Sequence, residues 1–205
     1  MLLTIDGLDG SGKTTAIATL VEMCNANGIK ATSVAEPGTT PLGLHVREFH
    51  LAHSETISPM SQLHLMLAAR AENAIYIKAL LEEYDVVFVD RWLHSTLTYQ
   101  YLQHLDYWNN QKDSDEVIDW IYEEHGKVVG GLVPDKMIYL SIPQGIRRER
   151  LEARGKVYDL DKATFSDELD RASLDIAILL GMKICRDNAR LITDVMDDVK
   201  EVFNK

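Results

Sequence analysis

The chain divides into short apolar runs and longer stretches in which apolar residues recur at helical spacing. A short apolar run at residues 1–5 is long enough for a buried strand, and residues 136–142 predict another strand. The continuous apolar run at 86–89 is typical of a strand buried on both faces of a sheet. Residues 30–35 predict another strand, and Leu191-Ile192-Thr193 predicts a short fifth one. Because predicted helices separate these runs, we expect an α/β fold: a five-stranded, mostly parallel sheet with helices on both faces.

The helical stretches alternate with the strands. Ile17, Leu20, Val21 and Cys24 form one helical stripe, which Gly28 ends. Further helices are predicted from near residue 42, over 59–84, from the third strand to about 104, over 115–128 and 144–154, from 166 onward, and over 195–203. Loops are predicted at 36–41, 106–113, 130–131 and 155–162. Parallel strands bring their carboxyl ends to one edge of the sheet, where such folds bind ligands.

The first strand leads into Gly7-Leu8-Asp9-Gly10-Ser11-Gly12-Lys13-Thr14, which fits the phosphate-binding loop G-x-x-x-x-G-K-[ST]. Its glycines let backbone N–H groups turn toward a phosphate, and the start of the next helix adds partial positive charge. Lys13 can reach the β- and γ-phosphates, and the Thr14 hydroxyl can hold Mg²⁺. A glycine-rich turn that only caps a helix is the plainer alternative. The preceding strand favours a nucleoside triphosphate site made by Gly7, Gly10, Ser11, Gly12, Lys13, Thr14 and Thr15.

Asp90 and Arg91 directly follow the apolar run at 86–89. P-loop proteins place an acid at this point to help hold Mg²⁺, so we expect Thr14 and Asp90 to share a magnesium ion. An aspartate that only caps the next helix is the alternative. Arg91 favours the functional interpretation, because an arginine at the ligand-binding edge suits bidentate recognition of phosphate.

Arg147, Arg150 and Arg154 are spaced by three and four residues and therefore share one stripe of a helix, with Arg148 nearby. Such a cluster can close over a triphosphate and stabilise the charge of a moving phosphoryl group. For any single arginine, a solvated helix face paired with neighbouring glutamates is the alternative. We expect at least one of the four to act on the nucleotide.

Composition narrows the function further. The net charge of −11 argues against general nucleic-acid binding, so local arginines must hold any anionic substrate. Cys24 and Cys185 both lie in apolar helical patterns and form no disulfide framework. The spacing of His45, His50 and His53 does not favour a metal site. Without a signal-peptide pattern or a membrane-spanning run, we expect one cytoplasmic domain over residues 1–205.

In this order the motifs resemble the thymidylate kinases, P-loop enzymes that phosphorylate dTMP with ATP, and the similarity runs nearly end to end. It rests on residues 6–15, Glu36-Pro37-Gly38, Thr40-Pro41-Leu42-Gly43, Arg47, Leu67-Ala68-Ala69-Arg70, Asp90-Arg91, Ser95-Thr96, Tyr99-Gln100, Gly130-Gly131-Leu132, Pro134-Asp135, Ile138-Tyr139-Leu140 and Arg154-Gly155. The phosphate loop is shared with many families, whereas this combination is far more selective. The resemblance implies a three-layer P-loop fold with a short lid at approximately 147–165.

The resemblance also implies roles for single residues. Asp9 would bind the deoxyribose 3′-hydroxyl, Arg47 and Arg91 the 5′-phosphate of the acceptor, and Tyr99 would lie under the sugar. Arg70 and Gln100, with Ser95 and Thr96, would reach the thymine edge, and Glu36, Pro37 and Met66 would complete the substrate site. Gly10 stands where some members have a catalytic arginine, and members with glycine supply it from the lid. The implied catalytic group is Lys13, Arg91, Asp9, Arg150 and Arg154.

The chain departs from the family pattern in three places. Met66 occupies a position that is usually aromatic and stacks on thymine, and methionine covers a ring less rigidly. The lid sequence after Gly155 lacks an arginine often found there, so Lys156 or Arg154 must substitute. The loop at 102–113 lacks the usual glycines.

We therefore expect a homodimeric dTMP kinase that uses ATP and Mg²⁺ and converts dTMP to dTDP. A deoxynucleoside monophosphate kinase of broader base tolerance is the near alternative, prompted by Met66. A P-loop switch or regulatory ATPase is the alternative from another class. No Asn-Lys-x-Asp segment exists for guanine recognition, which disfavours a GTPase switch.

Overall fold

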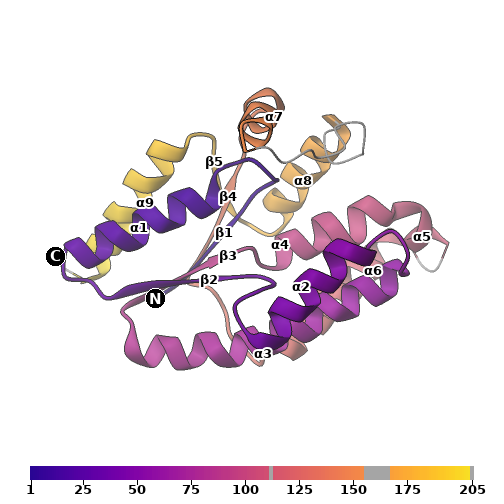
Figure 1. Cartoon of the computed structure of the whole chain (residues 1–205), viewed down its shortest axis with the longest axis horizontal. Helices are drawn as coiled ribbons and strands as arrows, with labels where there is room; N and C mark the ends of the chain where they lie inside the picture. Colours follow the sequence, from indigo (N-terminus) through magenta and orange to yellow (C-terminus); the bar gives the residue numbers. More distant parts are fainter. Residues whose placement is uncertain (111–112, 155–166, 204–205) are drawn as a thin grey trace.

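A computed structural model of the chain describes residues 1–110, 113–154 and 167–203. Within this part, five strands form one parallel sheet in the order β2-β3-β1-β4-β5 (Figure 1). The strands are β1 Leu2–Asp6, β2 Ala31–Ala35, β3 Val86–Asp90, β4 Lys136–Leu140 and β5 Lys183–Cys185. The predicted α/β class, with a five-stranded parallel sheet, is confirmed.

Helices cover both faces of the sheet. Leu3 and Ile5 of β1 belong to a core with α1 (Lys13–Ala26) and α9 (Asn188–Phe203), which lie side by side in Figure 1. Val87 and Val89 of β3 point the other way, into a core with α3 (Pro59–Glu83) and α6 (Ser114–Val129). Successive side chains of a strand point to opposite faces of the sheet. The apolar run of β3 therefore supplies both cores, with Val86 and Phe88 in the first and Val87 and Val89 in the second.

The other helices surround the ligand-binding edge of the sheet. They are α2 Pro41–His53, α4 Leu93–Thr96, the π-helical turn η1 Leu97–Tyr101, the 3₁₀ turn η2 Leu102–His104, α5 Leu105–Asn109, α7 Gln144–Glu152 and α8 Asp167–Leu179. The α2 and α3 helices each begin with a proline after a hydroxyl cap: Thr40 accepts from Gly43 N, and Ser58 accepts from Ser61 N. Such starts are favoured because proline has no N–H to satisfy.

Three predictions about local structure are wrong. Residues 191–193 are not a strand but belong to α9, in which Leu191, Val195 and Val199 are buried at four-residue spacing. The fifth strand is Lys183–Cys185, so Cys185 lies in a strand and not in a helix. Part of the predicted loop at 106–113 is the helix α5, because Trp108 is buried there and donates from Nε1 to Gln100 O at 2.7 Å.

The topology brings the predicted chemistry to one edge. The phosphate loop follows β1, Glu36-Pro37 follows β2, and Asp90 ends β3 beside β1. Strands β2 and β3 lie on one side of β1, and β4 and β5 lie on the other side. The loop after β1 therefore lies where the strand order reverses, which is where doubly wound sheets bind ligands. Among the described residues, no helix is both long and apolar enough to cross a membrane.

Candidate functional site

The phosphate loop lies between β1 and α1, as its motif predicts. Lys13 is buried, and its ammonium donates to Gly7 O at 2.7 Å and to Leu8 O at 3.3 Å. Burial, followed by the charge of Arg91, lowers the pKa of Lys13 to about 8. A phosphate entering the loop would offset both effects, so the lysine is suited to an anionic ligand.

A side chain at Gly10 would collide with the backbone of α7. A Cβ there would lie 2.5 Å from Arg147 O and 3.0 Å from Arg147 Cα, and the residue has a φ of +80°. The loop and α7 therefore pack through backbone atoms at this point. The contact gives a physical reason for a glycine at this position.

Thr14 and Asp90 lie together beside the loop. Thr14 Oγ1 donates to Asp90 Oδ2 at 2.5 Å. Asp90 Oδ1 is buried and accepts no hydrogen bond from the described residues. Hydroxyl and carboxylate oxygens, completed by water and phosphate, are the ligands that Mg²⁺ prefers. The two side chains therefore fit the magnesium site predicted from the sequence.

Arg91 connects the phosphate loop to a second cavity. Its φ of +82° is in the left-handed region, which an arginine rarely adopts and which often marks a functional position. The guanidinium forms an ion pair with Asp9, donates to Ser95 Oγ at 3.2 Å and lies 5.1 Å from the centre of the Tyr99 ring. Burial alone would raise the pKa of Asp9, but Arg91, Lys13 and Arg147 hold it below its ordinary value. The carboxylate is therefore ionised at neutral pH.

The second cavity has a volume of about 550 Å³ and is lined by every residue predicted to bind the acceptor. These are Asp9, Glu36, Pro37, Arg47, Met66, Arg70, Arg91, Ser95, Thr96, Tyr99 and Gln100. A smaller cavity of about 150 Å³ lies at the phosphate loop, where Lys13, Thr14, Thr15 and Asp90 line it. Asp9, Glu36, Arg47 and Arg91 line both. Two ligands bound in these cavities would meet at those four side chains.

Arg70 is buried and held by several neighbours. Its Nε pairs with Glu36 Oε2 at 2.6 Å, and one terminal nitrogen donates to Thr96 Oγ1 at 2.7 Å. The other terminal nitrogen donates to Trp92 O at 3.1 Å, and His125 Nδ1 lies 3.4 Å from the guanidinium. Burial, followed by Arg70, lowers the pKa of His125 to about 3. The ring is therefore neutral, and the guanidinium is fixed in place at the wall of the cavity.

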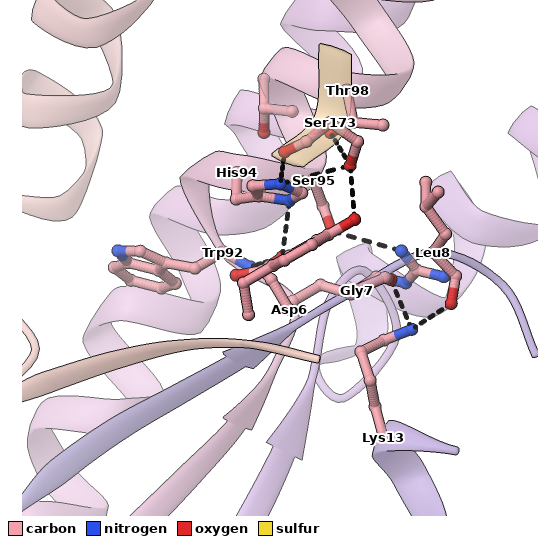
Figure 2. A network of polar contacts seen from close by, with 12 residues as sticks. Asp6, Gly7, Leu8, Lys13, Trp92, His94, Ser95, Thr98 and Ser173 are labelled. Carbon is pink, nitrogen blue, oxygen red and sulfur yellow. Dashed lines mark hydrogen bonds and ion pairs between the residues drawn. The ribbon is translucent and has the colours of Figure 1, made fainter. Parts of the chain in front are cut away.

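A buried polar network around Asp6, His94 and Ser95 is shown in Figure 2, and it contacts Arg91 through Ser95. Asp6 Oδ1 accepts from Ser95 Oγ at 2.6 Å. Ser95 Oγ in turn accepts from Arg91. His94 Nδ1 lies 3.9 Å from Asp6 Oδ1, while Nε2 lies 2.9 Å from Ser173 O of α8. Burial lowers the pKa of His94, so the ring is neutral and its one proton is on Nε2, facing that carbonyl. The network joins the end of β1 to α4 and α8.

The arginine stripe of α7 separates into two kinds of residue. Arg147 is buried and contacts Asp170, Ile142 O and Asp9 O, while Arg150 donates to Ser11 O at 2.8 Å. These two hold α7 against the phosphate loop. Arg154 lines the cavity at that loop, near Lys13. The predicted lid residues from Gly155 to 165, with Lys156 among them, lie outside the described residues.

Sequence reasoning missed six residues that also line the larger cavity. They are His50, Leu51, Ser54, Glu55, Gln62 and His104. They come from α2 and the residues just after it, from α3 and from η2, so no local motif groups them. Helical spacing is the sequence feature that could have placed some of them at the cavity. His50 is three residues from Arg47 and Gln62 is four from Met66, so each lies on the same helix face as a predicted site residue.

A parallel sheet with a phosphate loop, next to a second cavity lined with arginines, defines a P-loop phosphotransferase with a separate site for an acceptor. Comparison with known proteins gives the family. A family model described as thymidylate kinase matches residues 5–203. The chain belongs to the thymidylate kinase family and is therefore a kinase.

Individual relatives agree with this assignment. The thymidylate kinase of Thermomicrobium roseum is 36% identical over 154 residues, which is 74% of this chain and 68% of the relative. That of a Synechococcus species is 35% identical over 159 residues, 77% of this chain and 71% of the relative. A crystal structure of the thymidylate kinase from Ehrlichia chaffeensis aligns with a TM-score of 0.69 over 98% of both chains at 23% identity, which shows a shared fold.

Proposed function

We propose that this kinase transfers the γ-phosphate of ATP to the 5′-phosphate of dTMP, giving ADP and dTDP. The observation that supports it is the junction of the two cavities at Asp9, Glu36, Arg47 and Arg91. A triphosphate in the loop and a monophosphate nucleotide in the larger cavity would bring their phosphates together there. Family membership supports thymine as the acceptor base.

The reaction needs positioning and charge stabilisation more than covalent chemistry. The phosphate loop would hold the donor, with Lys13 near the transferred group. Arg47 and Arg91 would hold the acceptor phosphate, and Arg154 faces the same space. Mg²⁺ held by Thr14 and Asp90 would neutralise charge on the phosphates. Because Arg91 is fixed by Asp9 and Ser95, it would present the acceptor without rearrangement.

On the acceptor side, Asp9 would receive the 3′-hydroxyl, Tyr99 would lie under the sugar, and Arg70 and Gln100 would meet the base. Met66 is buried in the cavity wall, where a soft thioether takes the place of a rigid ring. This observation supports the alternative of broader base tolerance. A switch or regulatory ATPase would have no use for the larger cavity.

We further propose one kinase domain over 1–205 with a lid at approximately 147–165, acting in the cytoplasm as a homodimer. The long α3 helix has Ile75 and Tyr76 exposed on its surface, which supports a partner on that face.

A coupled assay of ADP release tests the function. With Mg²⁺ and ATP, we expect ADP only when an acceptor is added, and faster release with dTMP than with dUMP, dCMP, dGMP or dAMP. Lys13→Ala should lower kcat by a factor of at least about 100, because the donor loses a charge contact at the transferred group. ADP release without an acceptor would indicate an ATPase, and equal use of a second base would indicate broad specificity.

A further inference from the structure

The acceptor cavity continues beyond the residues that would hold dTMP. Three helical segments line it in parallel steps of three or four residues. From α2 onward these are Arg47, His50 and Ser54; along α3 they are Arg70, Met66 and Gln62; and from α4 to η2 they are Thr96, Gln100 and His104. At 1.5 Å per residue, Gln62 lies about 12 Å from Arg70 along α3. The last member of each series lies about one turn beyond Met66 and Gln100, which are expected at the base.

This far compartment is polar. Gln62 is buried and donates from Nε2 to Ser54 O at 2.8 Å and to Ile57 O at 3.4 Å, which closes the end between α2 and α3. His50 Nδ1 is buried and has no hydrogen-bond partner among the described residues. Burial, then the neighbouring His104, lowers the pKa of His50, and burial also lowers that of His104. Both rings are therefore neutral near pH 7, and each has one donor and one acceptor nitrogen.

The compartment is also open on one side. Leu51 is 73% exposed, and Glu55 is exposed next to it, so the cavity reaches solvent at the end of α2. A group that enters from the base is therefore not confined to a closed pocket. It would meet imidazole nitrogens on its way to water.

We propose that the acceptor site takes pyrimidine deoxynucleoside monophosphates with a hydrogen-bonding substituent at C5, such as 5-hydroxymethyl-dUMP, and that His50 and His104 line the space for that substituent. The inference rests on the proposed function and deepens it. The C5 position follows from the chemistry of the base. The sugar is attached at N1, so C4 and C5 are directed away from it. With Arg70 and Gln100 at the N3–O4 edge, C5 is the position that remains toward the far compartment.

The soft wall at Met66 is consistent with this assignment. A rigid ring stacked on the base would fix its position in the plane, whereas a methionine can shift to admit a larger C5 group. Two other acceptors, a purine nucleotide and a pyrimidine with an apolar C5 group, would fit the cavity less well. A purine would need a wider space at the base itself, and an apolar C5 group would offer no hydrogen-bond partner to the buried His50 Nδ1.

A panel of acceptors separates these possibilities in the wild-type protein. The ethyl group of 5-ethyl-dUMP has as many heavy atoms as a hydroxymethyl group but no hydroxyl. We expect kcat/KM for 5-hydroxymethyl-dUMP within about threefold of that for dTMP, and about tenfold above that for 5-ethyl-dUMP, the loss that one unmade hydrogen bond produces. A dTMP rate at least tenfold above the 5-hydroxymethyl-dUMP rate would overturn the proposal. So would equal use of the two C5-substituted acceptors, or of dGMP.

Replacement of a compartment residue locates the effect. His104→Leu should lower the ratio of kcat/KM for 5-hydroxymethyl-dUMP to that for 5-ethyl-dUMP by about five- to tenfold, because it removes a hydrogen-bonding group and keeps apolar bulk. His53→Leu is the matched control, since His53 lies on α2 and does not line the cavity. An unchanged ratio in His104→Leu, or an equal change in His53→Leu, would contradict the assignment. Failure of dTMP itself in the wild-type protein would refute the proposed function instead.

Discussion

Arg91 lines both cavities, and its geometry depends on a few neighbouring side chains. The left-handed backbone turns its side chain back toward the phosphate loop, where Asp9 neutralises it. Ser95 holds a second nitrogen, and Asp6 holds Ser95. A charge placed by buried hydrogen bonds is preorganised, which is how protein sites stabilise moving phosphoryl groups.

The Ser95 hydroxyl should therefore affect the acceptor more than the donor. In Ser95→Ala, Arg91 loses one of its polar anchors, and we expect the KM for dTMP to rise about tenfold, as for a hydrogen bond to a charged group. The KM for ATP should change less than twofold, because the phosphate loop keeps its contacts. Steady-state kinetics with each substrate varied in turn would measure the split.

Thr98→Val is the control for this variant, because Thr98 contacts Ser173 at the far end of the network and does not contact Arg91. Both KM values should stay near wild type there. An equal rise in the two KM values of Ser95→Ala would argue for general loosening of the site rather than for positioning of Arg91.

His125 should make the protein sensitive to acid. Burial and Arg70 depress its pKa to about 3, below the ordinary 6.5 of the unfolded chain. Between these values the unfolded state binds the extra proton, so stability is lost as pH falls from 6.5. The loss approaches about 1.4 kcal/mol per pH unit for one such group. His125→Gln keeps an acceptor for Arg70 without a titrating ring, so its thermal midpoint should fall less than that of wild type between pH 7 and 5.

His64→Gln provides the comparison, because His64 is exposed on α3. Its midpoint should follow the wild-type pH dependence. Identical acid sensitivity in wild type and His125→Gln would contradict a buried, neutral His125.

At the residue scale, the sequence predicts chemistry that lies within one short motif. The phosphate loop and the Asp90-Arg91 pair need only a strand to place them, so they were found. The contacts of Arg70 with His125, and of Asp6 with His94, join residues 55 and 88 positions apart. Only the packing of α3 on α6 and of β1 beside β3 brings them together, and no local pattern encodes it.

Helices and strands can be predicted from the sequence where their buried residues recur at a regular spacing. The central strands β1 and β3 are buried on both faces and are read directly from their apolar runs. Strand β5 is three residues long and, among the described residues, pairs with β4 alone, so its sequence has no such run. Leu191-Ile192-Thr193 has strand-like composition, but its neighbours at four-residue spacing bury one face of α9 against α1. Tertiary packing overrides local preference there.

The fit between α7 and the phosphate loop is an element-scale feature with a direct test. In Gly10→Ala the new Cβ would lie 2.5 Å from Arg147 O, so α7 must move away from the loop. We expect kcat to fall at least tenfold, because a displacement of about 1 Å can cost two orders of magnitude in rate. We also expect a loss of unfolding free energy clearly above the roughly 1–2 kcal/mol of left-handed strain alone.

Gly28→Ala isolates the strain. Gly28 has a φ of +71°, and a Cβ there would meet no atom within 4 Å. Its substitution should therefore cost only the backbone term and leave kcat unchanged. Chemical denaturation and kinetics on both variants would decide, and equal costs would show that close packing against α7 is not what requires Gly10.

On the scale of the whole molecule, the sheet sets the relation between the two ligands. Its carboxyl edge holds the phosphate loop at the centre and the acceptor cavity on the side of β2 and β3. The helix α3 packs against both α2 and α6, and the three lie near one another in Figure 1. Two of them, α2 and α3, supply cavity residues, so a partner bound on their outer surface would also stiffen the acceptor site.

The homodimer is the remaining prediction at this scale. We expect light scattering on the eluting protein to give about twice the chain mass of 23.2 kDa. The exposed pair Ile75 and Tyr76 lies on α3, and burial of their remaining exposed apolar surface would favour association. Ile75→Arg combined with Tyr76→Glu should therefore give a monomer with a raised KM for dTMP. Val133→Arg changes an equally exposed apolar residue in the loop before β4 and should leave the dimer intact. A monomeric wild-type protein, or a monomer produced by Val133→Arg as well, would exclude the α3 surface as the interface.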